Sequence, residues 1–276
     1  RWRWRDGAAW LGHSVPWRWA FVTYFRGVAA NVVMPGAVVG GDVLRAWGLH
    51  RRGVPVAEAG LSVVLDRLSG LWGLAILGVV VWGLCWIGGV SQPWEGPLAR
   101  WLGLSAEWLG VAAWCAAVLA VGVPAVALAL TPWVAARWMG WGRSPWRWWL
   151  TLARHAPWHH GTRQLIGSLA VQAASVTTLY CAAHAVGAPL PWATLAIAAV
   201  PVFVFATLPV GFGGWGTREA AAVLVLAPAG VEASHAVAIA VLYGLYPIAQ
   251  SALALWPMGS SAADRTPVPP TAAPHR

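Results

Sequence analysis

Charged side chains are scarce in this sequence. They make up 10% of the 276 residues, whereas soluble domains carry roughly a quarter. Hydrophobic residues reach 59%, and the mean hydropathy is +0.61. This balance excludes an ordinary soluble domain and predicts an all-α, polytopic transmembrane helical bundle.

Several stretches lack charge altogether, and each can supply the roughly 20 residues of a helix that crosses a bilayer. They lie between Arg67 and Glu95, between Glu107 and Arg137, between Arg163 and Arg218, and over 233–263. The third is long enough for two helices, which Pro189 and Pro191 separate because proline cannot continue a helix. We expect spans near 55–87, 108–130, 164–186, 192–210 and 235–256.

The sequence also lacks the common signatures of catalysis and of cofactor binding. Its three cysteines have no ligand-like spacing, and it has no serine nucleophile elbow, no HExxH motif and no Walker-type loop. We therefore expect no enzymatic activity, no cofactor and no bound metal.

Lysine is missing as well, so all 18 basic residues are arginines. They lie at the ends of apolar segments and not on one soluble face. This arrangement predicts contact with anionic lipid headgroups and argues against nucleic acid as a partner.

The arginine distribution also predicts the orientation in the membrane. Cytoplasmic loops are enriched in arginine, so we place the loops around 45–52 and 137–163 inside and the loop around 90–107 outside. A full crossing by residues 17–41 would then leave the N-terminal arginines outside. A re-entrant hairpin over 17–41 removes this conflict and is the favoured alternative.

Two interrupted segments share one pattern. Pro35–Arg45 and Pro209–Arg218 each combine a proline, a Gly-Gly pair and an arginine four residues beyond it, although the proline-to-glycine spacing differs by one residue. Broken helices in corresponding places of two halves indicate an internal repeat around a transport site. Glycine backbone, helix N-termini and arginine suit an anionic headgroup. The alternative is that the glycines serve helix packing and the arginines extend to the interface.

Ionisable residues at membrane depth are expensive, which makes five of them functional candidates: Arg26, Asp66, Arg67, Arg218 and Glu219. For Asp66 and Arg67, ion pairing between helices is an equally good explanation.

Three segments carry a resemblance to a known family. In order, they are Asn31–Arg45 (NVVMPGAVVGGDVLR), Ser62–Leu71 (SVVLDRLSGL) and Leu208–Ala221 (LPVGFGGWGTREAA). They resemble the lysylphosphatidylglycerol synthase transmembrane, or flippase-like, family over residues 1 to about 257. The resemblance implies a multi-pass protein of the cell inner (plasma) membrane that handles lipids. Bifunctional members aminoacylate phosphatidylglycerol and move the product between leaflets.

The resemblance also divides the chain and assigns residues. It implies a flippase-like domain over 1–257, with N-terminal helices missing before Arg1, and leaves 258–276 as a disordered tail. The aminoacyl-transferase domain is absent, so we expect a stand-alone member. Carried over by position, the lipid-binding residues are Asn31, Pro35, Gly41, Asp42, Arg45, Asp66, Arg67, Pro209, Gly211, Gly213, Gly214, Gly216, Arg218 and Glu219.

The leading hypothesis is a protein that binds an anionic or aminoacylated phospholipid, or a related lipid, and moves it between leaflets. Arg45 and Arg218 would bind the phosphate, and Asp42 and Glu219 an amine, at a cavity between the two broken elements. The alternatives are an intramembrane enzyme acting on a lipid phosphate and a non-transporting subunit or anchor. The sequence identifies no partner synthase, oligomeric state, lipid, direction or energy source.

Overall fold

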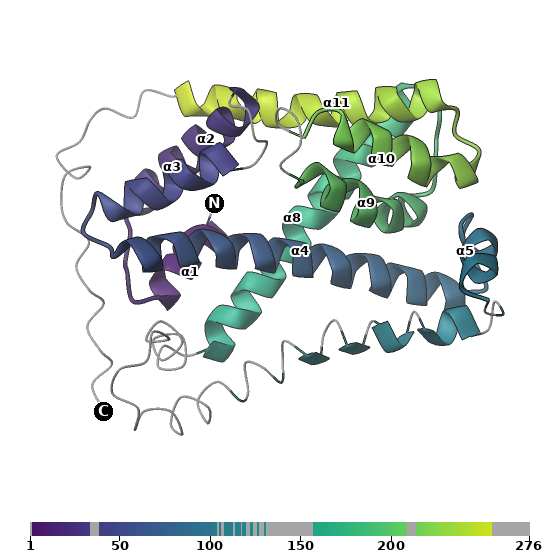
Figure 1. The fold of residues 1–276 in the computed structure, drawn as a ribbon, viewed down its shortest axis with the longest axis horizontal. Helices are drawn as coiled ribbons and strands as arrows, with labels where there is room; N and C mark the ends of the chain where they lie inside the picture. Colours follow the sequence, from purple (N-terminus) through teal and green to yellow (C-terminus); the bar gives the residue numbers. More distant parts are fainter. Residues whose placement is uncertain are drawn as a thin grey trace.

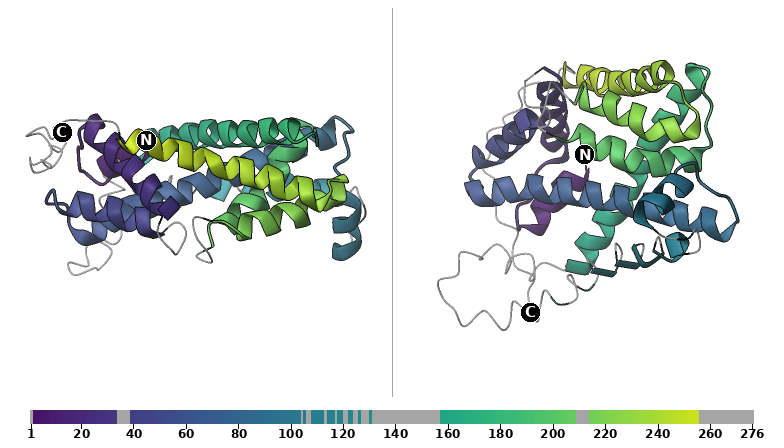
Figure 2. Two further views of the ribbon diagram at one scale, coloured as in Figure 1. Left: turned by 90° about the horizontal axis from the view of Figure 1, so that it is seen from above. Right: turned by 45° about the vertical axis from the view of Figure 1, so that its right-hand side comes forward.

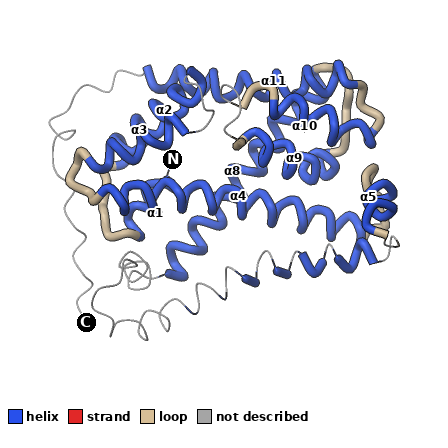
Figure 3. The backbone as a smooth tube through the Cα atoms, in the orientation of Figure 1, coloured by secondary structure: helices blue, strands red, loops and turns tan. Residues whose placement is uncertain are grey.

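The computed structural model describes residues 2–33, 39–103, 157–208 and 214–255, together with scattered helical or loop residues between 105 and 130. Every element assigned within these residues is a helix, which confirms the expected all-α bundle (Figures 1 and 3). In chain order these elements are α1 (Trp2–Trp10), α2 (Trp17–Val33), α3 (Val39–His50), α4 (Val56–Ile87), α5 (Glu95–Leu102), α8 (Pro157–Ala185), α9 (Trp192–Ala206), α10 (Thr217–Leu226), η1 (Ala227–Ala229), α11 (Ala233–Ser251) and η2 (Ala252–Leu255).

Three helices of the described chain are long and apolar enough to cross a membrane: Val56–Ile87, His159–Ala185 and Ala233–Ser251. They correspond to three of the expected spans, and they support a multi-pass membrane protein. The span expected over 192–210 is different, because α9 ends at Ala206 after 15 residues, a rise of only about 22 Å. The helix expected over 108–130 is described only in part, the loop expected around 137–163 is described only from Pro157 onward, and the tail 258–276 lies outside the described residues.

Helices α2 and α3 form an antiparallel pair. Near the turn, the Asn31 carboxamide accepts a hydrogen bond from the Gly41 backbone N–H at 2.6 Å, and Gly27 packs directly against Gly41. Farther from the turn, Gly48 lies against the Trp19 ring. The contacting residue numbers decrease along α2 as they increase along α3, so the two helices form a hairpin. The 17 residues of α2 give it a length of about 25 Å. The connection at 34–38 lies outside the described residues, and re-entry of 17–41 from one side of the membrane stays a prediction.

Helices α9 and α10 form a second pair. Gly214 adopts a left-handed φ of +80°, and a side chain there would collide with the backbone carbonyl of Ala206 at the end of α9. Glycine is therefore required at this close approach. The short α9 consequently turns back through α10 instead of continuing across.

The two largest of three hydrophobic clusters in the described residues join most of the helices. The larger joins α4, α8, α9, α10 and α11 through fully buried side chains such as Leu74, Val176, Leu195, Leu226 and Ile239. The smaller surrounds Trp4 of α1 and includes Leu49 and Val54 at the end of α3. The N-terminal helices therefore pack into the same bundle as the rest of the described chain.

The packing repeats itself between α1–α4 and α8–α11. Helix α2 packs on α3 and α3 on α4, as α9 packs on α10 and α10 on α11. Between the two sets, α4 packs on α9 and α11 packs on α2, while α1 contacts α8. Figure 1 shows α4 and α11 running along the two hairpins, and α8 lies beside α11 (Figure 2). Exchanging the two sets reproduces these contacts, although the packing of α4 on α8 has no equivalent between α11 and α1 in the described chain; the shared pattern supports the predicted internal repeat.

The two hairpins open toward opposite ends of the bundle. The connections that flank α2–α3 lie at one end, where His13 bonds Glu58 at 2.5 Å, and the connections that flank α9–α10 lie at the other (Figure 3). At the second end, Thr194 of α9 donates a hydrogen bond to Gln92 beyond α4. The repeats are therefore inverted relative to one another, the arrangement of many transporters.

Candidate functional site

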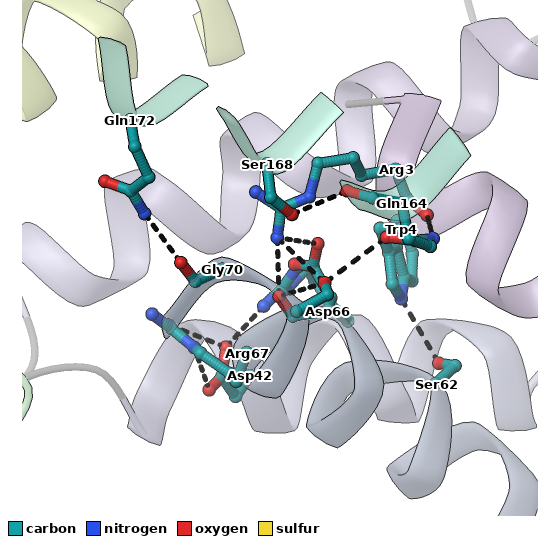
Figure 4. Close-up of polar contacts among 12 residues, drawn as sticks. Arg3, Trp4, Asp42, Ser62, Asp66, Arg67, Gly70, Gln164, Ser168 and Gln172 are labelled. Carbon is teal, nitrogen blue, oxygen red and sulfur yellow. Dashed lines mark hydrogen bonds and ion pairs between the residues drawn. The ribbon is translucent and has the colours of Figure 1, made fainter. Parts of the chain in front are cut away.

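Five charged side chains form a continuous network between α1, α3 and α4 (Figure 4). Arg45 donates to Asp42 at 2.6 Å and to Asp66 at 2.8 Å. Arg3 donates to the other oxygen of Asp66 at 3.0 Å, and Arg67 holds both oxygens of Asp42 at 2.9 and 3.0 Å. Three arginines against two aspartates leave one net positive charge when all are ionised.

The local sequence explains why these groups meet. Asp42 and Arg45 are three residues apart on α3, so they lie on one face, and that face packs against the α4 segment that carries Asp66 and Arg67. Arg45 and Asp66 are buried, with side-chain exposures of 5% and 10%. Asp42 at 22% and Arg67 at 36% form the accessible edge of the network.

A ring of neutral polar groups completes the buried side of the network. The Arg3 guanidinium also reaches the backbone carbonyl of Asp66 at 2.5 Å and the Ser69 hydroxyl at 3.3 Å. Gln164 of α8 donates to the Arg3 backbone carbonyl at 2.5 Å and accepts from Ser69 at 3.3 Å (Figure 4). Arg3, Ser69 and Gln164 were absent from the predicted site. Only the basic character of the first five residues drew attention to Arg3, and nothing in the sequence marked the other two.

Aromatic rings surround the central arginine. The Arg45 guanidinium carbon lies 5.2 Å from the Tyr24 ring centroid and 5.6 Å from that of Trp4. Two carboxylates and two rings therefore hold Arg45 in one position, and both of its terminal amino groups already donate to aspartate.

A second, smaller cluster lies at the start of α10. Arg218 donates to one Glu219 oxygen from Nη2 at 2.6 Å and from Nε at 3.2 Å, and the other oxygen accepts the Gly216 backbone N–H. The Arg218 guanidinium carbon lies 4.8 Å from the Trp215 ring centroid and 5.9 Å from that of Tyr243 on α11. The Arg218 side chain is 4% exposed.

The structure thus brings the predicted residues together as two clusters. Asp42, Arg45, Asp66 and Arg67 belong to the first, with Asn31 and Gly41 at the adjoining hairpin contact. Gly214, Gly216, Arg218 and Glu219 belong to the second. Pro35, Pro209, Gly211 and Gly213 lie outside the described residues. Arg26 is exposed on α2 and is not among the described members of either cluster.

The two clusters lie on different helices with different neighbours. Arg45 is on α3, which packs against α2 and α4, whereas Arg218 is on α10, which packs against α9 and α11. Arg45 and Arg218 therefore have different helix neighbours, and the single phosphate expected for both stays a prediction. Within the described part of the chain, no group of three His, Cys, Asp or Glu residues could hold a metal ion.

Comparison with known proteins adds one finding. Residues 1–254 match the model of the lysylphosphatidylglycerol synthase TM region family. This range includes both hairpins and both charged clusters. Searches of curated proteins and of solved structures returned no match. The helical architecture, the candidate membrane spans and this match over nearly the whole chain agree, and the protein belongs to the lysylphosphatidylglycerol synthase TM region family.

Proposed function

We propose that this protein binds an anionic or aminoacylated phospholipid, or a related lipid, and moves it between the leaflets of the cell inner (plasma) membrane. The observation that carries the proposal is the five-residue charged network on α1, α3 and α4. Desolvating five charges is costly, and ionisable groups at membrane depth usually mark a substrate path. Its net positive charge favours an anionic ligand.

The accessible edge of the network suits a lipid headgroup. Arg67 presents a planar guanidinium whose geometry matches a phosphate, and Asp42 beside it can accept a hydrogen bond from an ammonium group. A phosphate that approaches Arg67 competes with the Asp42 carboxylate for the N–H donors at Nε and Nη2 of Arg67. Arg45 is enclosed by two carboxylates, so we assign it the role of holding Asp42 and Asp66 in place.

The inverted packing supports movement between leaflets. One hairpin opens toward each end of the bundle, so each leaflet would meet one hairpin with its own arginine. Rocking of the two repeats against one another would expose the two sites in turn.

The charge at the two ends supports the proposed orientation. Exposed basic residues gather at the end where α2–α3 opens: Arg5, Arg18, His50, Arg51 and Arg163. Among the described residues, the opposite end carries two acids and one arginine, Glu95, Glu232 and Arg100, together with His184 and His235. The positive-inside rule therefore places the first end in the cytoplasm.

A leaflet-accessibility assay with fluorescent phospholipids tests the proposal on the full-length protein in liposomes. We expect Arg67→Gln and Asp42→Asn to slow lipid movement about tenfold, because each removes a charged hydrogen-bonding group from the accessible edge. Arg100→Gln is the matched control, because Arg100 is an exposed arginine on α5, and its rate should equal that of the wild type.

The assay also separates this proposal from its alternatives. Wild-type protein that moves none of the tested lipids, or Arg67→Gln and Asp42→Asn rates equal to the wild-type rate, would overturn translocation at this site. A lipid recovered with altered chemistry would instead indicate an intramembrane enzyme.

A further inference from the structure

The internal repeat assigns counterparts to the residues around each arginine. Arg45 and Arg218 each lie four residues beyond a glycine at a close helix approach, Gly41 and Gly214. The residue after this glycine is Asp42 in the first repeat and Trp215 in the second, and each contacts the arginine of its own repeat.

The long helix of each repeat supplies the other neighbours. When α4 and α11 are aligned at their first residues, Val56 and Ala233, Asp66 corresponds to Tyr243 and Arg67 to Gly244. Both members of the second pair contact Arg218: the Tyr243 ring faces the guanidinium, and Gly244 lies directly against it. The aligned positions are therefore charged in the first repeat and uncharged in the second.

This exchange changes which hydrogen-bond donors remain free. In the first repeat, Asp42 and Asp66 occupy both terminal amino groups of Arg45. In the second, Glu219 binds Nε and Nη2 of Arg218, and no hydrogen bond joins Nη1 to any residue in the described ranges. Aromatic rings attract a cation through their faces and consume none of its N–H donors. Arg218 is thus held in a buried position with one amino group available.

We propose that Tyr243 and Gly244 are positioning residues that hold the Arg218 guanidinium with Nη1 free to donate to the phosphate of a lipid headgroup. This inference rests on the proposed function and deepens it at the second hairpin. Tyr243 supplies a ring face against the guanidinium, and Gly244 supplies the space in which the guanidinium lies.

The variant Gly244→Ala tests whether the space beside Gly244 is needed to hold the Arg218 guanidinium. The new methyl group would overlap the guanidinium of Arg218, which is the flexible end of a side chain, so the guanidinium should move while the helices remain in place. Gly60→Ala on α4 is the matched control, because nothing lies within 4 Å of the methyl group there. Tyr243→Leu removes the ring, and Tyr243→Phe keeps it.

The readout is the phosphatidylglycerol mole fraction that half-saturates lipid movement in liposomes, measured separately from the maximal rate. We expect Gly244→Ala and Tyr243→Leu to raise this fraction about tenfold, the effect of losing one charge-assisted hydrogen bond, with a smaller change in the maximal rate. Gly60→Ala and Tyr243→Phe should stay within about twofold of the wild type, since neither displaces the guanidinium. In an Arg218→Lys background, Gly244→Ala should change the fraction less than about twofold, because the two residues act through one contact.

Two results would overturn the inference while lipid movement itself persists. One is wild-type half-saturation in Gly244→Ala and Tyr243→Leu. The other is an undiminished Gly244→Ala effect in the Arg218→Lys background, which would indicate a general packing defect.

A binding measurement separates this inference from the proposed function. Phosphatidylglycerol retained by the detergent-solubilised full chain is counted by native mass spectrometry, with inorganic phosphate as competitor. Reduced retention in Gly244→Ala supports the site even if the wild type moves no lipid, and unchanged retention contradicts it. Displacement of the lipid by millimolar inorganic phosphate would assign the site to a free anion instead.

Discussion

Asp66→Ala is expected to lower the free energy of unfolding by about 3–5 kcal/mol, because removing one partner of a buried ion pair leaves the opposite charge uncompensated. Here two arginines lose their partner, since Asp66 accepts from Arg3 at 3.0 Å through one oxygen and from Arg45 at 2.8 Å through the other. All three side chains are 10% exposed or less, so water cannot replace the lost bonds. Three helices meet at this carboxylate, and the loss should affect the whole bundle.

Unfolding in mixed micelles, followed by circular dichroism, measures this loss. Glu232→Gln is the control, because Glu232 is 75% exposed and its ion pair with His235 spans 3.9 Å. It should change stability by less than about 0.5 kcal/mol. Adding Arg3→Leu to Asp66→Ala should recover part of the loss, since one fewer cation is left buried and Arg45 keeps Asp42. A loss below about 1 kcal/mol for Asp66→Ala would mean that the network is hydrated.

Gly41→Ala is expected to cost about 2–3 kcal/mol and to separate the first hairpin. A methyl group at Gly41 would overlap the backbone carbonyl of Gly27 and the carboxamide of Asn31. Backbone cannot rotate away as a side-chain end can, so α3 must move from α2, and overpacking of this kind typically costs 1–3 kcal/mol. The movement would also break the 2.6 Å bond from the Gly41 N–H to Asn31.

The same unfolding experiment checks this prediction, with Gly60→Ala as the control. Alanine at Gly60 meets open space within a helix and should be neutral or stabilising by up to about 1 kcal/mol. Equal stabilities for the Gly41 and Gly60 variants would show that α2 and α3 are not held at the close approach described here.

Much of the architecture could be predicted because lipid-exposed spans must be apolar over their whole length. The absence of charge alone predicted α4, α8 and α11. The same criterion predicted α9 to be too long, because the sequence stays apolar through 207–210 although the helix ends at Ala206. Helix ends of this kind depend on a tertiary contact, here the approach of Gly214 to Ala206, which composition does not record.

Four of the five charged residues in the network were among the residues that the sequence singled out, but the contacts between them could not be predicted. Buried charge in an apolar segment singled out Asp66 and Arg67, and the Gly-Gly pattern singled out Asp42 and Arg45. Sequence reasoning could not identify Arg3, which lies 63 residues from its partner Asp66. Tyr243 and Gly244 are ordinary residues of an apolar helix, and only the alignment of α11 with α4 relates them to Asp66 and Arg67.

The central claim is that two hairpins enter the membrane from opposite sides, and labelling of single cysteines tests it most directly. In a background without the native cysteines, one label each is placed at four exposed positions: Ser14, Arg51, Ser91 and Ser234. Ser14 and Arg51 flank the first hairpin, whereas Ser91 follows α4 and Ser234 follows the second hairpin. A membrane-impermeant thiol reagent applied to oriented vesicles should label Ser14→Cys and Arg51→Cys from the cytoplasmic side, and Ser91→Cys and Ser234→Cys from the other. Labelling of Ser14→Cys and Arg51→Cys from different sides would show that the chain crosses the membrane once between them, which contradicts the account.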